Sequence, residues 1–224
     1  MMISVSDDWM ETCPDVRVGI IALEGVQNTK GNTHLDRKRR LLEESLRGRY
    51  LGKNRKEIAK APPFAEYQGY FRKFGHNYPV LLQLETVALK GRPLWSPSPL
   101  VSAMFMAELE WGFLTAGHYL DAISQPIHLD IAKGDEKYVT MGGKERVLKK
   151  GDMFLSDQAG ILSSVLYGPD NMSMITPETS RALFTVYGPS MTEATAIRHY
   201  LEEIEKTVRV FSPDARKADL SILP

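Results

Sequence analysis

The pattern of apolar residues changes at Asp121, and this change constrains the fold more than any other feature of the sequence. Before Asp121 apolar residues recur at helical spacing, and after it they alternate with polar residues in short runs separated by Gly and Asp. The runs read PIHLDIA, KYVTMGGKERVL, MFLSD, GILSSVLYG and ALFTVYG. The paired glycines of Met141–Lys144 suit a tight hairpin turn. The second half of the chain is therefore predicted to form an antiparallel sheet.

The first half is predicted to be mainly helical. Leu100–Trp111 is apolar on most sides, which is typical of a central helix, and Val101, Phe105 and Leu109 share one face that we expect to be buried. The other expected elements are a strand over Val16–Leu23, one broken helix or two short ones over Leu35–Ala61 with Thr33 as N-cap, a loop over Gly69–Pro79, a helix over Val80–Gly91 and a helix over Thr192–Val208. The sequence thus predicts one α+β domain over residues 1–224, with a core at about 16–211 and a polar tail at 212–224.

Composition excludes several classes of protein. The apolar fraction of 43% can bury a sizeable core, so the chain is not intrinsically disordered. Its 28 basic residues balance 28 acidic ones, so no overall field attracts a polyanion and any contact with nucleic acid must be local. The single cysteine, Cys13, excludes an internal disulfide and a thiolate-rich metal site, and we interpret it as a small apolar filler.

The N-terminal residues argue against secretion. Asp7, Asp8 and Glu11 stand where a signal peptide needs a basic start and an apolar run. No stretch approaches the roughly 20 apolar residues that cross a bilayer, so we expect no membrane association. A lone cysteine also suits a reducing compartment. These features predict a cytoplasmic location.

Three segments together resemble a known family. They read SPLVSAMFMAELEWGFLTAGHYLDAI, GDEKYVTMGGKERVLKKGDMFLSD and YGPDNMSMITPETSRALFTVY. In order, they contain a helix, a turn ending in Leu-Asp, a strand, a Gly-Gly hairpin, a strand ending in Asp, a Gly-Pro-Asp loop and Thr-Pro-Glu-Thr before the last strand. This order is similar to that of the B3/B4 tRNA-editing domain of the phenylalanyl-tRNA synthetase β subunit, over about Tyr70 to Tyr187. The opening VRVGIIALEGV looks like the first strand of free-standing members.

The resemblance implies a fold and an activity. The implied B3/B4-like fold is a mainly antiparallel sheet packed against a central helix and flanking helices, with a pocket between two sub-lobes. The implied activity is that of an esterase that hydrolyses a wrong amino acid from the 3′ end of tRNA. The family has a histidine after the central helix and a glutamate in the last strand. Ungapped matching places Ala116 and Thr185 at those positions, so the chain departs from the family pattern at both.

His118, in TAGHYLD, lies two residues from the family's histidine position, in a predicted turn. An imidazole that titrates near neutral pH can hold or polarise a water that attacks an ester, so His118 is the candidate catalytic residue. The alternative, a hydrogen-bonded turn histidine, stays open. The other histidines lack partners at i+3 or i+4, so no metal site is expected.

Candidate substrate-binding residues precede and follow the central helix. Tyr70 and Arg72 lie in a glycine-bearing segment, and a forked guanidinium binds a carboxylate or phosphate in bidentate fashion. The alternative for Arg72 is an ion pair with Glu85. Glu110, at the end of the central helix, is a candidate for orienting a ligand amine, or else a solvated charge.

Two loops resemble those that border the family's pocket. YGPD supplies Tyr167 and Gly168, and TPET supplies Thr176 and Thr179. Backbone amides in such turns can bind an oxyanion or a carboxylate. One cleft is expected to be bordered by Tyr70, Arg72, His118, Gly168 and Thr179. Because the chain has no GxSxG elbow, P-loop or Rossmann fingerprint, no cofactor is expected.

Basic residues are concentrated between Arg37 and Lys60. Counted from Asp36, ten Lys or Arg stand against four acidic residues. Such a patch can contact tRNA phosphates weakly, with an affinity that falls as salt rises. The alternative is a solvated helix face.

Two functional hypotheses follow from these features. The leading one is an aminoacyl-tRNA deacylase that acts in trans on a mischarged amino acid. The other is a non-catalytic module that binds tRNA or a small amino-acid-like ligand in the same pocket, and the residues Ala116 and Thr185 keep it open. A subunit that docks onto a synthetase is disfavoured, because no large apolar helix face is expected to be exposed.

Overall fold

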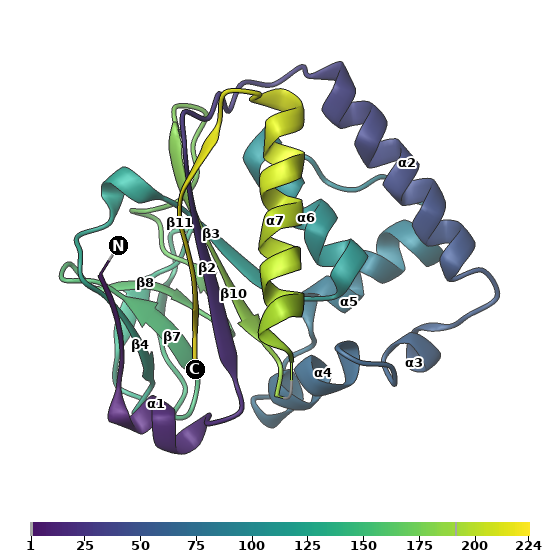
Figure 1. Ribbon diagram of the computed structural model, residues 1–224. Helices are drawn as coiled ribbons and strands as arrows, with labels where there is room; N and C mark the ends of the chain where they lie inside the picture. The colour runs from purple at the N-terminus through teal and green to yellow at the C-terminus, as the bar shows by residue number, and fades with distance from the viewer. Residues whose placement is uncertain (1, 191) are drawn as a thin grey trace.

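The computed structural model describes residues 2–190 and 192–224, which form two sheets and a layer of helices (Figure 1). The central sheet has four antiparallel strands in the order β11-β2-β10-β3. These strands are β2 (Arg17–Glu24), β3 (Thr115–Tyr119), β10 (Arg181–Gly188) and β11 (Arg216–Leu223). The expected strand over Val16–Leu23 is therefore confirmed, and it is an inner strand of this sheet.

The second sheet has five strands in the order β1-β4-β7-β8-β9, with β1 parallel to β4 and the other pairs antiparallel. Its strands are β1 (Ile3–Val5), β4 (Ile127–Ile131), β7 (Met153–Ser156), β8 (Ile161–Ser164) and β9 (Gly168–Pro169). A separate hairpin joins β5 (Lys137–Val139) to β6 (Glu145–Val147) across the expected Gly-Gly turn. The alternating runs after Asp121 thus predicted β4 to β8 correctly, whereas β1 and its parallel pairing with β4 were not expected.

Helices cover one face of the central sheet, and the second sheet lies on the other side (Figure 1). The long helices are α2 (Thr33–Arg49), α4 (Phe64–Lys73), α6 (Pro99–Trp111) and α7 (Ala194–Phe211). The shorter ones are α1 (Asp7–Thr12), α3 (Arg55–Ile58), α5 (Pro79–Leu84), the π-helical turn η1 (Glu85–Leu89) and the 3-10 turn η2 (Leu120–Ala122). The protein therefore has the mixed α+β fold that the sequence predicts.

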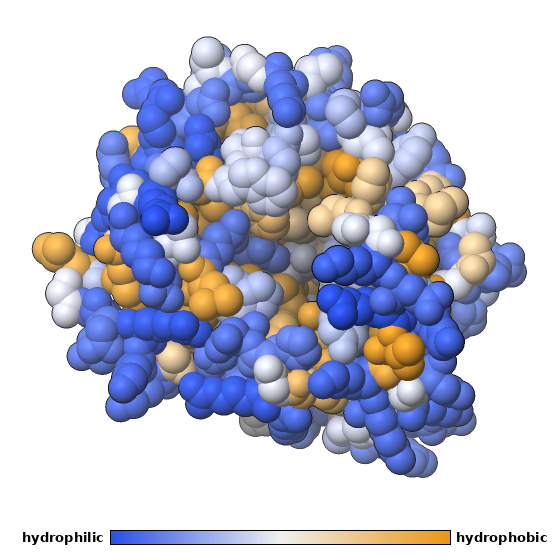
Figure 2. Space-filling view, turned by 180° about the vertical axis from the view of Figure 1, so that it is seen from behind, coloured by the Kyte–Doolittle hydropathy of each residue, from blue (hydrophilic) through white to orange (hydrophobic). Residues whose placement is uncertain are grey.

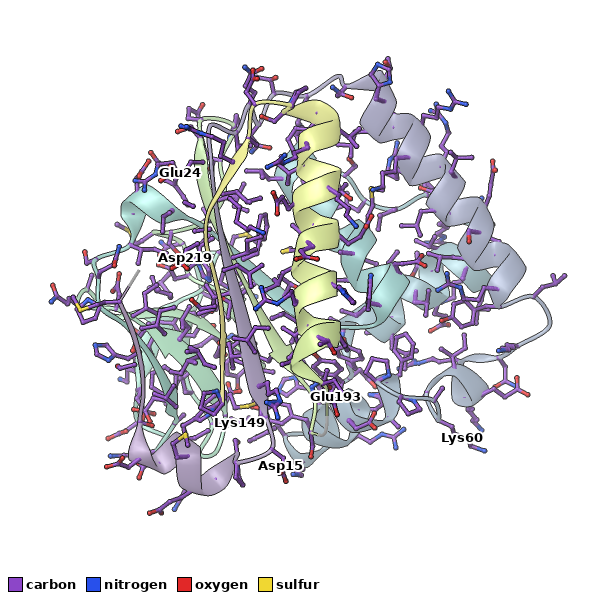
Figure 3. The ribbon with its side chains drawn as sticks, viewed as in Figure 1. Asp15, Glu24, Lys60, Lys149, Glu193 and Asp219 are labelled. Carbon is purple, nitrogen blue, oxygen red and sulfur yellow. The ribbon has the colours of Figure 1, made fainter. Side chains whose placement is uncertain are left out.

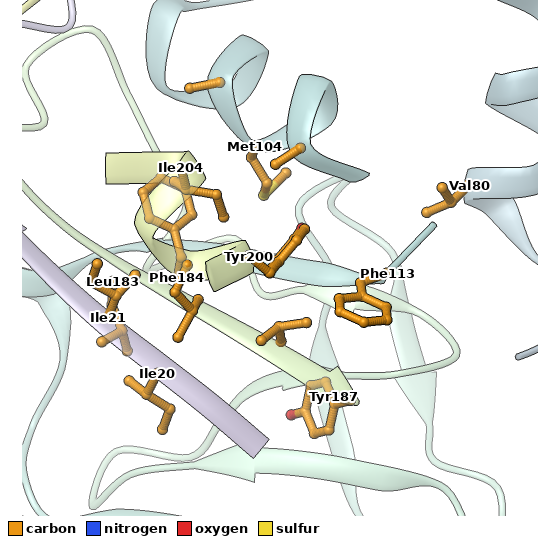
Figure 4. Close-up of a cluster of buried hydrophobic side chains, with 14 of the residues drawn as sticks. Ile20, Ile21, Val80, Met104, Phe113, Leu183, Phe184, Tyr187, Tyr200 and Ile204 are labelled. Atoms are coloured by element: carbon orange, nitrogen blue, oxygen red, sulfur yellow. The ribbon is translucent and has the colours of Figure 1, made fainter. Parts of the chain in front are cut away.

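Helix α7 is positioned by its apolar stripe. Ile197, Leu201, Ile204 and Val208 recur at helical spacing and are fully buried. They face β2 and β10, where Phe184 is also fully buried (Figure 4). Burying such a stripe against a sheet is the main source of stability for a helix of this length.

Helix α6 is the central helix. The Ser98 hydroxyl caps its N-terminus by accepting a hydrogen bond from the Val101 amide at 3.4 Å, and Gly112, with a left-handed φ of 74°, ends it. Of the three residues expected to be buried on one face, Leu109 is buried, whereas Val101 and Phe105 are half-buried. These two are open on one side because they line a cavity.

Two of the helix boundaries expected from the sequence were wrong. Asn32, not Thr33, caps α2, because its side-chain oxygen accepts the Leu35 amide at 3.0 Å. The expected loop over Gly69–Pro79 begins inside α4. Its glycine at position 69 is tolerated there because it lies on the exposed side of the helix.

The expected polar tail at 212–224 was also wrong. After the end of α7 the chain turns back and adds β11 to β2 as an edge strand. Leu220, Ile222 and Leu223 are half-buried there, and Arg216 and Lys217 are exposed. An edge strand that covers little of the core has no clear apolar alternation, and so it reads as polar.

In the part of the chain that the structure describes, no helix is both long and apolar enough to cross a membrane.

The N-terminal residues that precede the first expected strand have regular structure. The Ser6 hydroxyl caps α1, and the Trp9 side chain is fully buried below it.

Gly19 is expected to be essential for the packing of β2 against α7. A Cβ atom at position 19 would lie 2.3 Å from Ile197 Cγ2, closer than packed side chains allow. We expect Gly19→Ala to lower the free energy of unfolding by about 1–3 kcal/mol, as overpacking usually does. Gly48→Ala is the control, since that helical glycine has no neighbour within 4 Å of an added Cβ and should gain up to about 1 kcal/mol. Denaturant unfolding measures both, and equal midpoints would contradict the packing argument.

Candidate functional site

A cavity of about 550 Å³ lies between α5, α6, β3 and the loops around β9. Its apolar lining comes from Val80, Trp95, Val101, Met104, Phe105, Leu114, Met141, Ile175 and several prolines, and its polar lining from Lys30, Gln83, Ser98, Glu108, Thr115 and Thr176. Figure 2, which shows the face behind α7, has a hollow near its middle with apolar side chains gathered around it. An apolar cavity with a few converging polar groups is the usual form of a small-ligand site.

Among the described residues in the wall of this cavity, Glu108 is the one with an acidic side chain. It lies on α6, only 4% exposed, and its Oε1 accepts a hydrogen bond from the Thr115 amide at 2.8 Å. Burial raises the pKa of Glu108 to about 8. At neutral pH the carboxyl is therefore mostly protonated and can donate a hydrogen bond or a proton.

Three buried tyrosines hold the segment between α6 and β3 in place. Tyr78 donates to the Gly112 carbonyl at 2.8 Å, and Tyr67 accepts from the Leu114 amide at 3.1 Å. The Tyr200 hydroxyl bonds to that of Thr115. The amide that bonds Glu108 is thereby fixed from three sides, which favours a single orientation of the carboxyl.

A smaller cavity of about 250 Å³ adjoins the first and shares Pro79, Leu114, Thr115 and Gly168 with it. Ala116, Ser164, Tyr167 and Tyr187 complete its lining with Val165 and Leu166. The two cavities meet at Gly168, whose φ of 77° lies in the left-handed region that favours glycine. The two cavities therefore belong to one region of the molecule, with Gly168 in the wall of both.

Ala116 and Thr185, which occupy the family's histidine and glutamate positions, face each other across β3 and β10. Among residues 2–190 and 192–224, no partner bonds the buried Thr185 Oγ1, and a buried hydroxyl without a partner costs free energy. Tyr187 points away from α7 in Figure 4, and it lines the smaller cavity.

His118 lies in strand β3 and not in the turn that we expected. Thr115 and Gly117 of this strand face the larger cavity, so alternation turns His118 to the opposite face, toward the second sheet. The side chain is fully buried and lines neither cavity. A catalytic role for His118 stays a prediction, but the geometry gives its imidazole no direct access to a ligand there.

A chain of hydrogen bonds fixes the protonation of His118. Ser173 donates to Asp170 Oδ1, so its oxygen accepts from His118 Nδ1 at 2.7 Å. His118 Nε2 is then left to accept from the Ser163 hydroxyl at 3.3 Å. Burial lowers the pKa of His118 to about 4, which keeps the ring neutral. The imidazole thus ties β3 to the loop that carries Asp170 and Ser173.

This burial predicts an acid-sensitive contribution to stability. Since the pKa of His118 falls from about 6.5 in the unfolded chain to about 4 in the fold, its contribution is complete above pH 6.5 and is lost as pH falls toward 4. We expect the free energy of unfolding of the wild type to fall by about 3 kcal/mol over that range because of His118, and we expect this fall to be absent in His118→Phe. Urea unfolding at several pH values measures it, with the exposed His199→Gln as control. Parallel pH curves for wild type and His118→Phe would contradict the assignment.

Three other expected site residues lie away from the larger cavity. The Tyr70 hydroxyl donates to Asp152 at 2.7 Å, and its ring lines a different cavity of about 380 Å³ between α4 and the second sheet. Arg72 is exposed, and its expected alternative partner Glu85 pairs with Lys90 at 2.9 Å instead. Glu110 pairs with a guanidinium of α2. The expected single cleft therefore does not include Tyr70 or Arg72, and Glu110 is taken up by an ion pair.

The two loops expected to border the pocket do meet there. Gly168 lines both cavities, Thr176 lines the larger one, and Tyr167 lines the smaller one. Thr179 lines neither, but its hydroxyl accepts the Thr176 amide at 2.9 Å and so closes the turn that presents Thr176. Loop interruptions converge on the site as the sequence suggested, although fewer residues take part.

The basic segment on α2 and α3 is partly occupied by ion pairs. Lys38 pairs with Glu203 at 2.9 Å, and Arg49 pairs with Glu110 at 2.5 Å. Exposed cations remain at Arg37, Arg40, Lys53, Lys56 and Lys60, and Lys60 lies at the outer edge of the molecule in Figure 3. Searched over all residues that the structure describes, His, Cys, Asp and Glu form no group of three that could hold a metal ion.

The chain is similar to known proteins both in sequence and in fold. A family model described as the B3/4 domain matches residues 82–209, more than half of the chain. The crystal structure of an N-terminal fragment of the phenylalanyl-tRNA synthetase beta-subunit from Pyrococcus horikoshii is similar, with a TM-score of 0.53 and 13% identity over 100% of this chain and 54% of that one. The chain thus spans about half the length of that fragment. No curated protein matches the sequence.

Proposed function

The chain belongs to the B3/4 domain family, and we propose that it hydrolyses the ester between a wrong amino acid and the 3′ end of tRNA, acting in trans. Its fold resembles that of a phenylalanyl-tRNA synthetase beta-subunit fragment. Hydrolytic editing is what the sequence resemblance implies for this fold. The activity proposed for this chain rests on that implication together with the chemistry of the site.

One observation carries the proposal. The cavity of about 550 Å³ combines apolar walls with the buried carboxyl of Glu108, whose pKa of about 8 lies near the working pH of a cell. Apolar walls suit the side chain of an amino acid, and a general acid or base works best when its pKa lies near the ambient pH.

Hydrolysis needs little more than this group. A water oxygen forms a bond to the ester carbonyl carbon, and the bond from that carbon to the ribose oxygen breaks. The leaving ribose oxygen takes the proton of Glu108, and the carboxylate takes back a proton from the attacking water. The Thr115 amide, 2.8 Å from Oε1, helps to stabilise the carboxylate that forms in between.

The loop residues form the proposed substrate-binding set. Gly168 and Thr176 border the ester in the larger cavity, Tyr167 lies at the smaller one, and Thr179 supports the Thr176 turn. His118 has a positioning role, because it anchors the loop beyond Gly168 through Ser173.

A second candidate is a module that binds without hydrolysis. It is favoured by Ala116 and Thr185, which replace two ionisable family residues with an alkyl group and an unpaired hydroxyl. In this case a tRNA end or an amino-acid-like ligand occupies the same cavities, and Glu108 serves as a hydrogen-bond donor to it.

A deacylation screen distinguishes the two candidates. Purified protein is mixed with a panel of tRNAs, each carrying a wrong amino acid, and the release of the amino acid is followed with time. We expect at least one substrate to be released faster than in buffer and faster than with Glu108→Gln protein. Saturable binding of tRNA with no release from any substrate would leave the binding module as the function.

Contact with the tRNA body is proposed through the exposed cations of α2 and α3, Arg37, Arg40, Lys53, Lys56 and Lys60. Each phosphate contact adds affinity that falls as the salt concentration rises. With a balanced overall charge, this contribution is local, and weak, salt-sensitive binding is expected.

A further inference from the structure

Trp95 is exposed at the mouth of the larger cavity. Its side chain is 64% exposed, although it is among the largest apolar side chains in the protein, and it lines the cavity. Trp9, in contrast, is fully buried. The exposed indole is continuous with the apolar lining of the cavity, and an exposed apolar patch of this kind marks a binding surface.

The loop that carries Trp95 is held rigidly. The Leu94 amide donates to Glu43 at 3.0 Å, and the Leu94 carbonyl accepts from Arg39 at 3.2 Å. On the other side, the hydroxyls of Ser96 and Ser102 are 2.5 Å apart. Since its neighbours are tied to α2 and α6, the indole is presented in place before any ligand arrives.

Aromatic and thioether groups line the same cavity as Trp95. The ring of Phe105 lies 6.0 Å from the indole, inclined by 33°, and reaches into the cavity. Met141, 55% exposed on the hairpin between β5 and β6, lines the same cavity. A flat ring can therefore lie against the indole at the opening of a cavity that also carries a polarisable sulfur.

Lys30 supplies a positive charge at this mouth. It lines the cavity and is exposed, and among the described residues no acidic side chain forms a salt bridge with it. A cation and an exposed aromatic ring that line the same cavity are a combination that can bind single-stranded nucleic acid, through a phosphate and a stacked base.

We propose that Trp95 is the stacking site for the last nucleobase of an RNA 3′ end, with Lys30 near its phosphate. This inference rests on the proposed function, because the ester attached to that nucleotide then enters the cavity between Phe105 and Glu108. The cavity takes the amino acid, and the base remains outside against the indole. The same stacking serves the binding module, since it needs no hydrolysis.

The test uses uncharged RNA, so that it does not depend on hydrolysis. Binding of the oligonucleotide CCA, and of CCA with an abasic last nucleotide, is measured by titration against the full-length protein at low salt. Trp95→Ala is expected to weaken binding of CCA about tenfold, the usual effect of losing one stacked base. Trp95→Phe, which keeps an aromatic face, is expected to retain most of the affinity. The abasic oligonucleotide should bind wild type and Trp95→Ala equally weakly.

Leu41→Ala provides the control, because Leu41 is 57% exposed on a different face formed by α2. It should bind CCA as wild type does. Three results would each overturn the inference. They are an unchanged affinity of Trp95→Ala for CCA, a wild-type affinity for the abasic oligonucleotide equal to that for CCA, and no binding of CCA at all. If CCA binds through Trp95 but no mischarged tRNA is hydrolysed, the deacylase proposal fails and the stacking site stands. If mischarged tRNA is hydrolysed with the same KM by Trp95→Ala and by wild type, the stacking site fails and the deacylase proposal stands.

Discussion

Glu108→Gln is expected to lower the deacylation rate by a factor of about 10² or more, the usual effect of removing a general acid. Glutamine keeps the shape of the side chain, and its carbonyl can still accept the Thr115 amide that now lies 2.8 Å from Oε1. It cannot transfer a proton to the leaving ribose oxygen. The rate of amino-acid release from the best substrate of the screen, measured at saturating substrate, reports the loss.

The pH profile provides a second test of this residue. Because the pKa of Glu108 is raised to about 8, the wild-type rate should fall as pH rises through about 8, where the carboxyl loses its proton. The residual rate of Glu108→Gln should not show this fall. Glu44→Gln, an exposed change on α2, is the control and should leave both the rate and the profile unchanged.

Stability gives a readout that separates chemistry from folding. The pKa of Glu108 is higher in the fold than the 4.5 of the unfolded chain, so its contribution is complete below pH 4.5 and is lost as pH rises through about 8. Wild type should therefore lose up to about 5 kcal/mol relative to Glu108→Gln across this range. If Glu108→Gln deacylates as fast as wild type while showing this stability difference, the carboxyl is buried as assigned but takes no part in the reaction.

The strands and the central helix could be predicted because their buried positions are apolar and recur at a regular spacing in the sequence. In β4, Ile127, Leu129 and Ile131 alternate with half-buried residues, and α6 is apolar nearly all round because neighbours cover it on most sides. Elements at the margin of the core leave no such period. This is why β11 read as a tail and why the glycines of the segment after Pro63 hid the helix α4.

Only some residues of the candidate site could be predicted from the sequence, for a related reason. Gly168 and Thr176 lie in loops, where turn residues mark an interruption of regular structure that sequence can reveal. Glu108 was missed because a single acid within an apolar helix looks like a polar face, and its burial depends on partners far along the chain, such as Thr115 and Tyr200. His118 was placed in a turn, and a strand turns alternate residues to opposite faces. A shift of one residue decides whether a side chain meets a ligand or the core.

Removal of β11 is expected to lower stability strongly at every pH. In a chain that stops after Asp214, three half-buried aliphatic side chains, Leu220, Ile222 and Leu223, no longer pack beside β2. At roughly 1 kcal/mol for each half-buried side chain, the free energy of unfolding should fall by about 3 kcal/mol. The Trp9 indole also loses the Pro224 carbonyl that accepts its hydrogen bond at 3.1 Å, which adds to the loss.

The truncated chain should also aggregate, because the loss of β11 exposes the edge of β2. The residues of β2 from Val18 to Leu23 are almost all apolar and buried. An unpaired apolar edge is a template for pairing with another chain. Arg216→Gln with Ala218→Ser is the matched control, since both residues are exposed and the strand is kept, so stability should change by less than about 0.5 kcal/mol. Thermal unfolding and light scattering together decide the matter. A truncated chain that unfolds at the wild-type temperature and stays monomeric would mean that β2 needs no partner on this side, and the core would then have to be closed by α7 and β10 alone.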